Sequence, residues 1–171
     1  EEVNEDTIAL AQMNMYIHGI KQVELKQGDT LLSGKFKEKG RLKKFDVVIA
    51  NPPWNLDGYG GDVLKKSDSY EERFPFGDVP NQSADWAWIQ HMISTAKDKN
   101  GRIGIVLDSG ALFRGGKEKE IRKRFIESDL IDTVILLPEK LFYNTGAPGI
   151  IMILRKEKPQ NRKNKILIIN A

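Results

Sequence analysis

Residues 45–54 read FDVVIANPPW, and this stretch decides how the rest of the chain folds around it. Its first six residues are mostly apolar and branched, which is typical of a strand buried in a parallel sheet. Pro52 and Pro53 have no backbone N–H to donate to a neighbouring strand, so the strand must stop before them. The sequence therefore predicts a buried strand over 45–50 with a stiff turn at its carboxyl end.

The turn at 51–54 also predicts a chemistry. Residues before proline are held extended, so Asn51 and Pro52 are both constrained, and Pro53 keeps the corner rigid. The Asn51 side-chain oxygen and the Pro52 carbonyl can each accept one N–H from a flat amino-bearing ring, while Trp54 stacks on that ring. Holding both hydrogens favours a pyramidal nitrogen, and these bonds strengthen as positive charge develops there. The turn is therefore a candidate catalytic site for attack by an exocyclic amine.

The composition excludes several other classes of protein. The chain has 171 residues, of which 40% are hydrophobic and 30% charged, as expected of one globular domain. It has no cysteine and two histidines, which excludes disulfides and thiolate catalysis and predicts no metal site. No apolar run approaches the ~20 residues of a membrane span. The net charge of +3 permits a polyanionic partner without arguing for one.

Apolar periodicity predicts an alternating pattern of helices and strands. The predicted helices cover 5–18, 84–99 and 116–128, and the predicted strands lie within 21–29, 45–50, 102–107, 130–138, 149–156 and 165–171. Such alternation favours an α/β fold with a mainly parallel sheet, formed by residues 1–171 as a single domain. The last strands follow one another without helices, which predicts an antiparallel hairpin at one edge of the sheet.

Four features are expected at the carboxyl ends of strands. They are Glu2, Asp29, the 51–54 turn and the DSG sequence at 108–110, which begins with Asp108. Because ligands of doubly wound sheets bind at the carboxyl ends of the strands, we expect these residues to meet on one rim.

Most of the chain resembles the modification subunit of type I restriction–modification systems, a family of DNA adenine-N6 methyltransferases with an NPP[YFW] motif. The resemblance rests on residues 2–20, 28–31, 45–54, 84–93, 101–116 and 121–156. It implies a Rossmann-like, S-adenosylmethionine-dependent methyltransferase sheet, and site-specific methyl transfer to an adenine flipped out of double-stranded DNA. NPP[YFW] alone is less specific, because it also occurs in enzymes that methylate cytosine N4, guanine N2 or a glutamine amide.

The resemblance also implies a role for each matched position. Glu2 would hold the ribose hydroxyls of S-adenosylmethionine, and Asp29 would lie near the cofactor adenine. Asn51, Pro52, Pro53 and Trp54 would form the catalytic turn, with Asn51 also beside the cofactor. The partners implied are a DNA-specificity subunit, a second modification subunit and a restriction subunit, in the cytoplasm of a prokaryote.

The chain departs from the family at its N-terminal side. The glycine-rich cofactor loop and the first strand of the family lie upstream of Glu2 and have no counterpart in the sequence. We therefore expect a C-terminal portion of a methyltransferase catalytic domain, truncated at its first-strand side, with weak cofactor binding and doubtful catalysis in isolation. The strand over 45–50 would then have an unpaired edge.

Several alternatives stay open on the sequence alone. The turn could serve methylation of cytosine N4 or a glutamine amide, or the chain could be a non-catalytic assembly module of the same fold. Residues 55–82 show no periodicity, which suits either a loop over the base or DNA, or a mobile segment. The stretch GGKEKEIRKR at 115–124 suits phosphate binding or, more simply, a solvated helix face.

Overall fold

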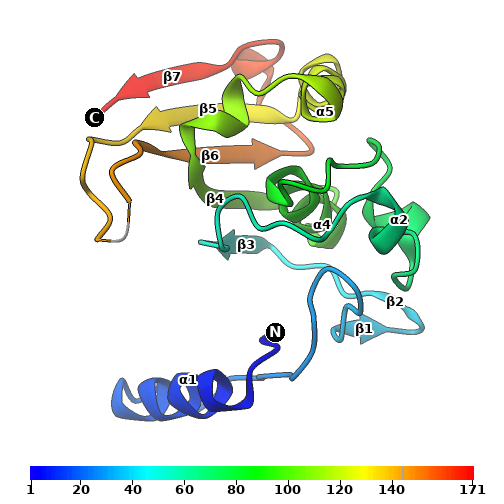
Figure 1. The fold of residues 1–171 in the computed structure, drawn as a ribbon, viewed down its shortest axis with the longest axis vertical. Coiled ribbons are helices and arrows are strands. Elements are labelled where there is room, and N and C mark those ends of the chain that lie inside the picture. Colours follow the sequence, from blue (N-terminus) through cyan, green and yellow to red (C-terminus); the bar gives the residue numbers. More distant parts are fainter. Residues whose placement is uncertain (144) are drawn as a thin grey trace.

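The computed structural model describes residues 1–143 and 145–171, which are built around one five-stranded sheet (Figure 1). The strands lie in the order β3-β4-β6-β5-β7. Their bounds are β3 Val47–Ala50, β4 Arg102–Asp108, β5 Ile131–Leu136, β6 Gly149–Arg155 and β7 Leu167–Asn170. Each of these strands coincides with a predicted apolar run, because branched side chains pack well on a pleated surface.

Four of these strands run in one direction. β3 is parallel to β4 and β5 is parallel to β7, whereas β6 is antiparallel to both of its neighbours, β4 and β5. The expected α/β, Rossmann-like and mainly parallel sheet is confirmed.

The antiparallel strand lies in a different place from the one expected. The hairpin was predicted at an edge of the sheet, but β6 lies inside it and β7 takes the edge. Ile150, Met152 and Leu154 of β6 are fully buried, whereas every residue of β7 is exposed. Placing the more apolar strand between two others removes more apolar surface from water, which explains the order.

Two helices pack together on the sheet and form its core. They are α4 (Asp85–Thr95) and α5 (Gly116–Glu127), and the rings of Trp86 and Phe125 meet between them at 5.2 Å. The helix predicted over 84–99 ends at Thr95, four residues early. The chain leaves the helix there because Phe45, which precedes β3, donates to the Thr95 carbonyl at 2.8 Å and accepts from Lys97 at 2.9 Å.

The N-terminal part of the chain lies away from β7, at the other end of the molecule (Figure 1). Helix α1 (Glu5–Ile17) begins as predicted, with the Asn4 side chain accepting from the Thr7 amide at 3.1 Å. None of its residues is buried. Its apolar side chains are exposed, among them Leu10, Met13, Tyr16 and Ile17.

The prediction of a strand within 21–29 was wrong. Among the described residues this segment forms a single parallel bridge, between Glu2 and Gln27, and no strand. The charged connector that follows contains a two-stranded ribbon of β1 (Lys37–Glu38) and β2 (Arg41–Leu42).

The segment 55–82 is a packed part of the fold. It contains two short helices, α2 (Gly61–Leu64) and α3 (Tyr70–Arg73), and its side chains Leu64, Phe74 and Val79 belong to the buried core. Two short 3₁₀ helices, η1 (Ser109–Leu112) and η2 (Gln160–Arg162), complete the elements. The interpretation of 55–82 as a merely mobile loop is therefore wrong.

Strand β3 is the other edge of the sheet. It was predicted to be buried, yet Val47 and Ile49 are 54% and 78% exposed, because β3 pairs with β4 alone among the described residues. The unpaired edge expected for this strand is thus present. A search of the described helices finds none with the length and apolar character to cross a membrane.

Candidate functional site

The 51–54 turn begins directly after β3, at the carboxyl end predicted for it. Asn51 is exposed, Pro52 is buried and Trp54 is half-buried. Among the described residues no backbone hydrogen bond uses the Pro52 carbonyl, so this oxygen has a free lone pair for a ligand. The corner therefore exposes the Asn51 side chain and holds the Pro52 carbonyl free of backbone partners, and its role toward a ligand stays a prediction.

An aromatic residue that sequence reasoning missed fixes the position of Trp54. The ring of Phe142 meets the Trp54 indole edge-on, with 4.8 Å between centroids and 77° between planes. Gly149, the first residue of β6, permits this contact, because a Cβ there would lie 2.6 Å from Phe142 and 3.2 Å from Trp54. The available sequence signal was a glycine at a strand start, shortly after the aromatic residues at 142–143.

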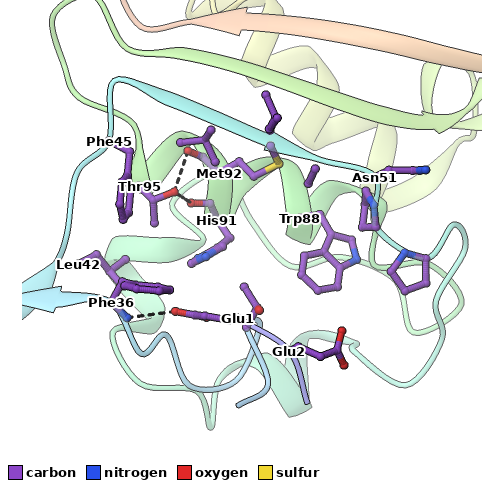
Figure 2. Close-up of a pocket in the computed structure, with 16 residues that line it drawn as sticks. Glu1, Glu2, Phe36, Leu42, Phe45, Asn51, Trp88, His91, Met92 and Thr95 are labelled. Carbon is purple, nitrogen blue, oxygen red and sulfur yellow. Dashed lines mark hydrogen bonds between the residues drawn. The ribbon is translucent and has the colours of Figure 1, made fainter. Parts of the chain in front are cut away.

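A large cavity lies between β3, α4 and the first two residues of the chain (Figure 2). Its volume is about 420 Å³. Figure 2 shows Glu1 and Glu2 on one side of it and the α4 side chains Trp88 and His91 on the other. Asn51, Pro52 and Pro53 also line it, so the candidate catalytic turn opens onto this space.

A smaller cavity of about 140 Å³ brings three of the predicted site residues together. Glu2, Asp29 and Pro53 all line it, although they come from three separate segments of the chain. Its other side chains are those of Glu1, Val3, Thr30, Leu56, Tyr59 and Trp88. Three of the four features expected on one rim thus meet here, whereas Asp108 lines neither cavity and pairs with Asn55 instead. Their roles toward a ligand stay predictions.

The Asp29 carboxylate is largely engaged by the chain itself. Its Oδ1 accepts from the amides of Leu31 and Leu32 at 2.9 and 3.1 Å, and its Oδ2 accepts from the Tyr59 hydroxyl at 2.6 Å. Burial, together with the bond to Asp29 and its charge, raises the pKa of Tyr59 to about 12. Tyr59 therefore stays a donor to Asp29 at neutral pH and joins the cavity wall, a role that its sequence position did not reveal.

Glu2 keeps more of its carboxylate for other partners. Its Oε1 accepts from the Asn4 amide at 2.9 Å, which places the carboxylate beside the start of α1. Its backbone is held by the bridge to the 26–28 segment, where the Gly28 amide donates to the Glu2 carbonyl at 2.9 Å. One carboxylate oxygen is thus fixed, while among the described residues no hydrogen bond uses the other.

His91 lines the large cavity but is held as part of the fold. Its Nδ1 accepts from Nε of the buried Arg73 at 3.2 Å, so the imidazole is neutral with its proton on Nε2. Burial, with the nearby Arg73 charge, lowers the pKa of His91 to about 3. These contacts give His91 a structural role.

The His91 pKa predicts an acid-sensitive stability. The folded pKa lies below the ordinary value of about 6.5, so this contribution is complete above pH 6.5 and is lost as the pH falls toward 3. We expect a loss of about 1.4 kcal/mol per pH unit in the free energy of unfolding from this group. Urea unfolding at pH 7, 6 and 5 measures it. His91→Gln, whose carbonyl can still accept from Arg73, should flatten the dependence, whereas His18→Gln on the exposed end of α1 should leave it unchanged.

The comparisons with known proteins agree on one family. A family model described as N-6 DNA methylase matches residues 1–171. The chain is 53% identical over 177 residues to the type I restriction enzyme MjaVIII methylase subunit of Methanocaldococcus jannaschii. It is 34% identical over 173 residues to the type I restriction enzyme HindI methylase subunit of Haemophilus influenzae. Both matches cover 100% of this chain but only 30% and 37% of those relatives, so the chain spans about a third of their length.

A solved structure extends this likeness to three dimensions. The type I restriction-modification system methyltransferase subunit from Streptococcus thermophilus matches with a TM-score of 0.85 and 35% identity, over 99% of this chain and 35% of that one. The family model spans the whole chain, and these relatives carry corresponding names. The chain therefore belongs to the N-6 DNA methylase family.

Proposed function

We propose that this chain carries the catalytic turn of a type I restriction–modification methylase subunit, which transfers a methyl group to N6 of adenine in double-stranded DNA. The observation that carries the proposal is the accessible 51–54 turn, opening onto cavities that Glu2 and Asp29 also line. The names of the relatives support the same activity. Since the chain spans about a third of their length, the activity is assigned to the complete subunit.

In this proposal each residue of the turn acts on the target base. The Asn51 side-chain oxygen and the Pro52 carbonyl accept the two amine hydrogens, and their bonds strengthen as positive charge develops on N6. Trp54 stacks on the flipped adenine, and Phe142 holds the indole at the required angle. Pro53 keeps the corner rigid, so little reorganisation is needed when the amine attacks.

The residues around the two cavities, which share Glu2, Pro53 and Trp88, suit S-adenosylmethionine, which would supply the electrophilic methyl group when bound. The Glu2 carboxylate is an acceptor suited to ribose hydroxyls, and the Val3, Pro53 and Leu56 side chains offer an apolar wall for an adenine ring. The Trp88 Nε1 is buried and has no hydrogen-bond partner among the described residues. A buried donor without a partner beside a cavity fits a ligand that brings an acceptor.

Partners follow from the same family. The relatives are named as methylase subunits of type I restriction enzymes, which supports assembly with a DNA-specificity subunit, a second methylase subunit and a restriction subunit. Recognition of the DNA sequence would then lie in the specificity subunit, and the turn described here would act on whichever adenine is presented to it.

Identifying the methylated base tests the proposal. The assembled enzyme, containing the full-length subunit, is incubated with double-stranded DNA and S-adenosylmethionine labelled in the methyl group, and the DNA is digested to nucleosides. We expect the label in N6-methyldeoxyadenosine. Label in N4-methyldeoxycytidine or in protein would assign a different planar amine. An assembled enzyme that binds DNA but transfers no label would favour the non-catalytic assembly module.

A further inference from the structure

The exit of the catalytic turn is tied to two buried carboxylates. Asn55, the residue after Trp54, has a φ of 51°, in the left-handed region that asparagine tolerates better than most residues. Its backbone amide donates to Oδ1 of Asp85 at 3.0 Å, and its side-chain Nδ2 donates to Oδ2 of Asp108. Asp85 is the first residue of α4 and Asp108 the last of β4, so both anchors belong to rigid elements.

A single arginine holds both of these carboxylates from the other side. Arg114 Nη1 donates to Asp108 at 2.9 and 3.2 Å, and its Nη2 donates to Oδ2 of Asp85. Its Nε donates to Glu118 on α5 at 2.7 Å. The planar guanidinium can serve three carboxylates at once in a fixed geometry, which an ammonium group cannot do.

The charge balance makes the anchors depend on Arg114. Asp85 is fully buried and Asp108 is 7% exposed, and among the described residues Arg114 is the one cation bonded to either. Burial raises the pKa of Asp85, while the Asn55 amide and Arg114 act in the opposite direction. Although burial acts to lower it, the bond to Glu118, with the charges of Glu118, Asp108 and Asp85, raises the pKa of Arg114. Without Arg114, two buried like charges would face each other unpaired and could not keep their present positions.

The backbone leaves room for this arrangement at Gly110. A Cβ at that position would lie 2.2 Å from Arg114 Nη1 and 2.6 Å from Oδ1 of Asp108, both too close for any side chain. The glycine in the DSG sequence at 108–110 is thus required by the packing of Arg114 against Asp108. Among the described residues no group of three His, Cys, Asp or Glu side chains is arranged to hold a metal ion, and the guanidinium is the centre of this cluster.

We propose that Arg114 is a positioning residue for the catalytic turn, because it holds Asp85 and Asp108 where both can bind Asn55. Pro52 and Pro53 stiffen the turn, and β3 fixes its start. Asn55 forms the other end of the turn, so the orientation of Trp54 and of the two acceptor oxygens depends on the bonds from Asn55 to Asp85 and Asp108. The catalytic part of this inference rests on the proposed function, whereas the anchoring part does not.

Substituting Arg114 by methionine tests the anchoring directly. We expect the Asn55 amide in the full-length subunit to exchange its hydrogen about 10- to 100-fold faster in Arg114→Met, since it loses a bond to a fixed carboxylate. The Gly58 amide, which donates to the Asn81 carbonyl outside this cluster, should exchange at its original rate. Asn55 exchange equal to wild type would overturn the proposal, whether or not the enzyme is active. Faster exchange at both the Asn55 and Gly58 amides would mean that Arg114 stabilises the fold in general, and this would also overturn the proposal.

The kinetic arm separates kcat from KM in the assembled enzyme. Arg114→Met should lower kcat for methyl transfer about 10- to 100-fold, because a misplaced turn costs catalysis, with KM for S-adenosylmethionine nearly unchanged. Arg122→Met is the matched control, because Arg122 binds the Ala111 and Arg114 carbonyls in the same corner and no carboxylate tied to Asn55. If Arg114→Met has the wild-type kcat although its Asn55 amide exchanges faster, the claim that this anchor supports catalysis is overturned. A wild-type enzyme without transferase activity would instead refute the proposed function and leave the exchange result to decide the anchoring.

Two further variants keep the test decisive if Arg114→Met folds poorly. Gly110→Ala displaces the guanidinium without removing any charged group, and should show the same loosened Asn55 amide and lowered kcat. Gly104→Ala on β4, where a Cβ would meet only ordinary contacts at 3.7 Å, is its control. Asn55→Gly keeps the backbone free to adopt its positive φ and removes only the bond to Asp108, so it should lower kcat by less than Arg114→Met. Wild-type behaviour of Gly110→Ala in both readouts would overturn the proposal.

Discussion

Replacing Asn51 by alanine is expected to lower kcat for methyl transfer about 100- to 1,000-fold, the usual cost of removing one donor or acceptor that serves the transition state. Asn51 is exposed at the end of β3, so the substitution removes no packing and should leave the fold intact. The effect should fall mainly on kcat, because the bond from the amine hydrogen strengthens as positive charge develops on N6.

Two variants sharpen this test in the assembled enzyme. Asn51→Asp keeps an oxygen at the same position and should retain more activity than Asn51→Ala, because a carboxylate still accepts the amine hydrogen. Asn161→Ala removes an exposed asparagine side chain far along the chain, in η2, and should have no effect on either constant. Steady-state methyl transfer with unfolding curves for each variant provides the measurement. If the Asn51→Ala enzyme is stable and works at the wild-type rate, the Asn51 side chain does not hydrogen-bond the amine in the transition state.

The sheet was largely predictable because each of its strands is coded by a local run of branched apolar residues. The 45–50 run predicted β3, and its two prolines predicted where the strand stops. What local patterns could not supply was the order of the strands. The position of β6 inside the sheet depends on how much apolar surface each strand buries against partners distant in the sequence, and those partners are unknown before the fold.

The same distinction separates the parts of the candidate site. The 51–54 turn was recognisable because its chemistry lies in four consecutive residues. The cluster around Arg114 was not, because its carboxylates come from α4, β4 and α5. Asp108 was expected at the rim of the sheet, but Asp85 and Glu118 alone read as ordinary helix residues, and nothing local links the three to Arg114. The end of α4 at Thr95 was missed for a related reason, since the pairing of Phe45 with the chain beyond the helix overrides the helical pattern of 84–99.

Replacing Arg73 by methionine is expected to lower the free energy of unfolding by about 3 kcal/mol. Arg73 is fully buried in α3, where its guanidinium donates to the Thr30 carbonyl, to Nδ1 of His91 and to Asp68. Methionine fills much of the volume but leaves the buried His91 acceptor and the half-buried Thr30 carbonyl without this donor, at about 1–3 kcal/mol for a buried group and less for a half-buried one. Burial lowers the pKa of Arg73, so removing a buried charge offsets part of this loss.

The pairing of Arg73 with His91 allows the contribution of this anchor to be isolated. Urea unfolding of Arg73→Met should be compared with Lys66→Met, which replaces an exposed cation of the same segment and should change stability little. In the double variant with His91→Leu, whose side chain cannot accept from Arg73, the two losses should not add, because both substitutions remove the same hydrogen bond. Arg73→Met should also weaken the acid sensitivity of His91, since the Arg73 charge is one cause of its lowered pKa. If the two losses in the free energy of unfolding add and the pH dependence is unchanged, Arg73 and His91 do not stabilise the fold through their hydrogen bond. Apolar packing alone would then hold α3 and the rest of the 55–82 segment against α4.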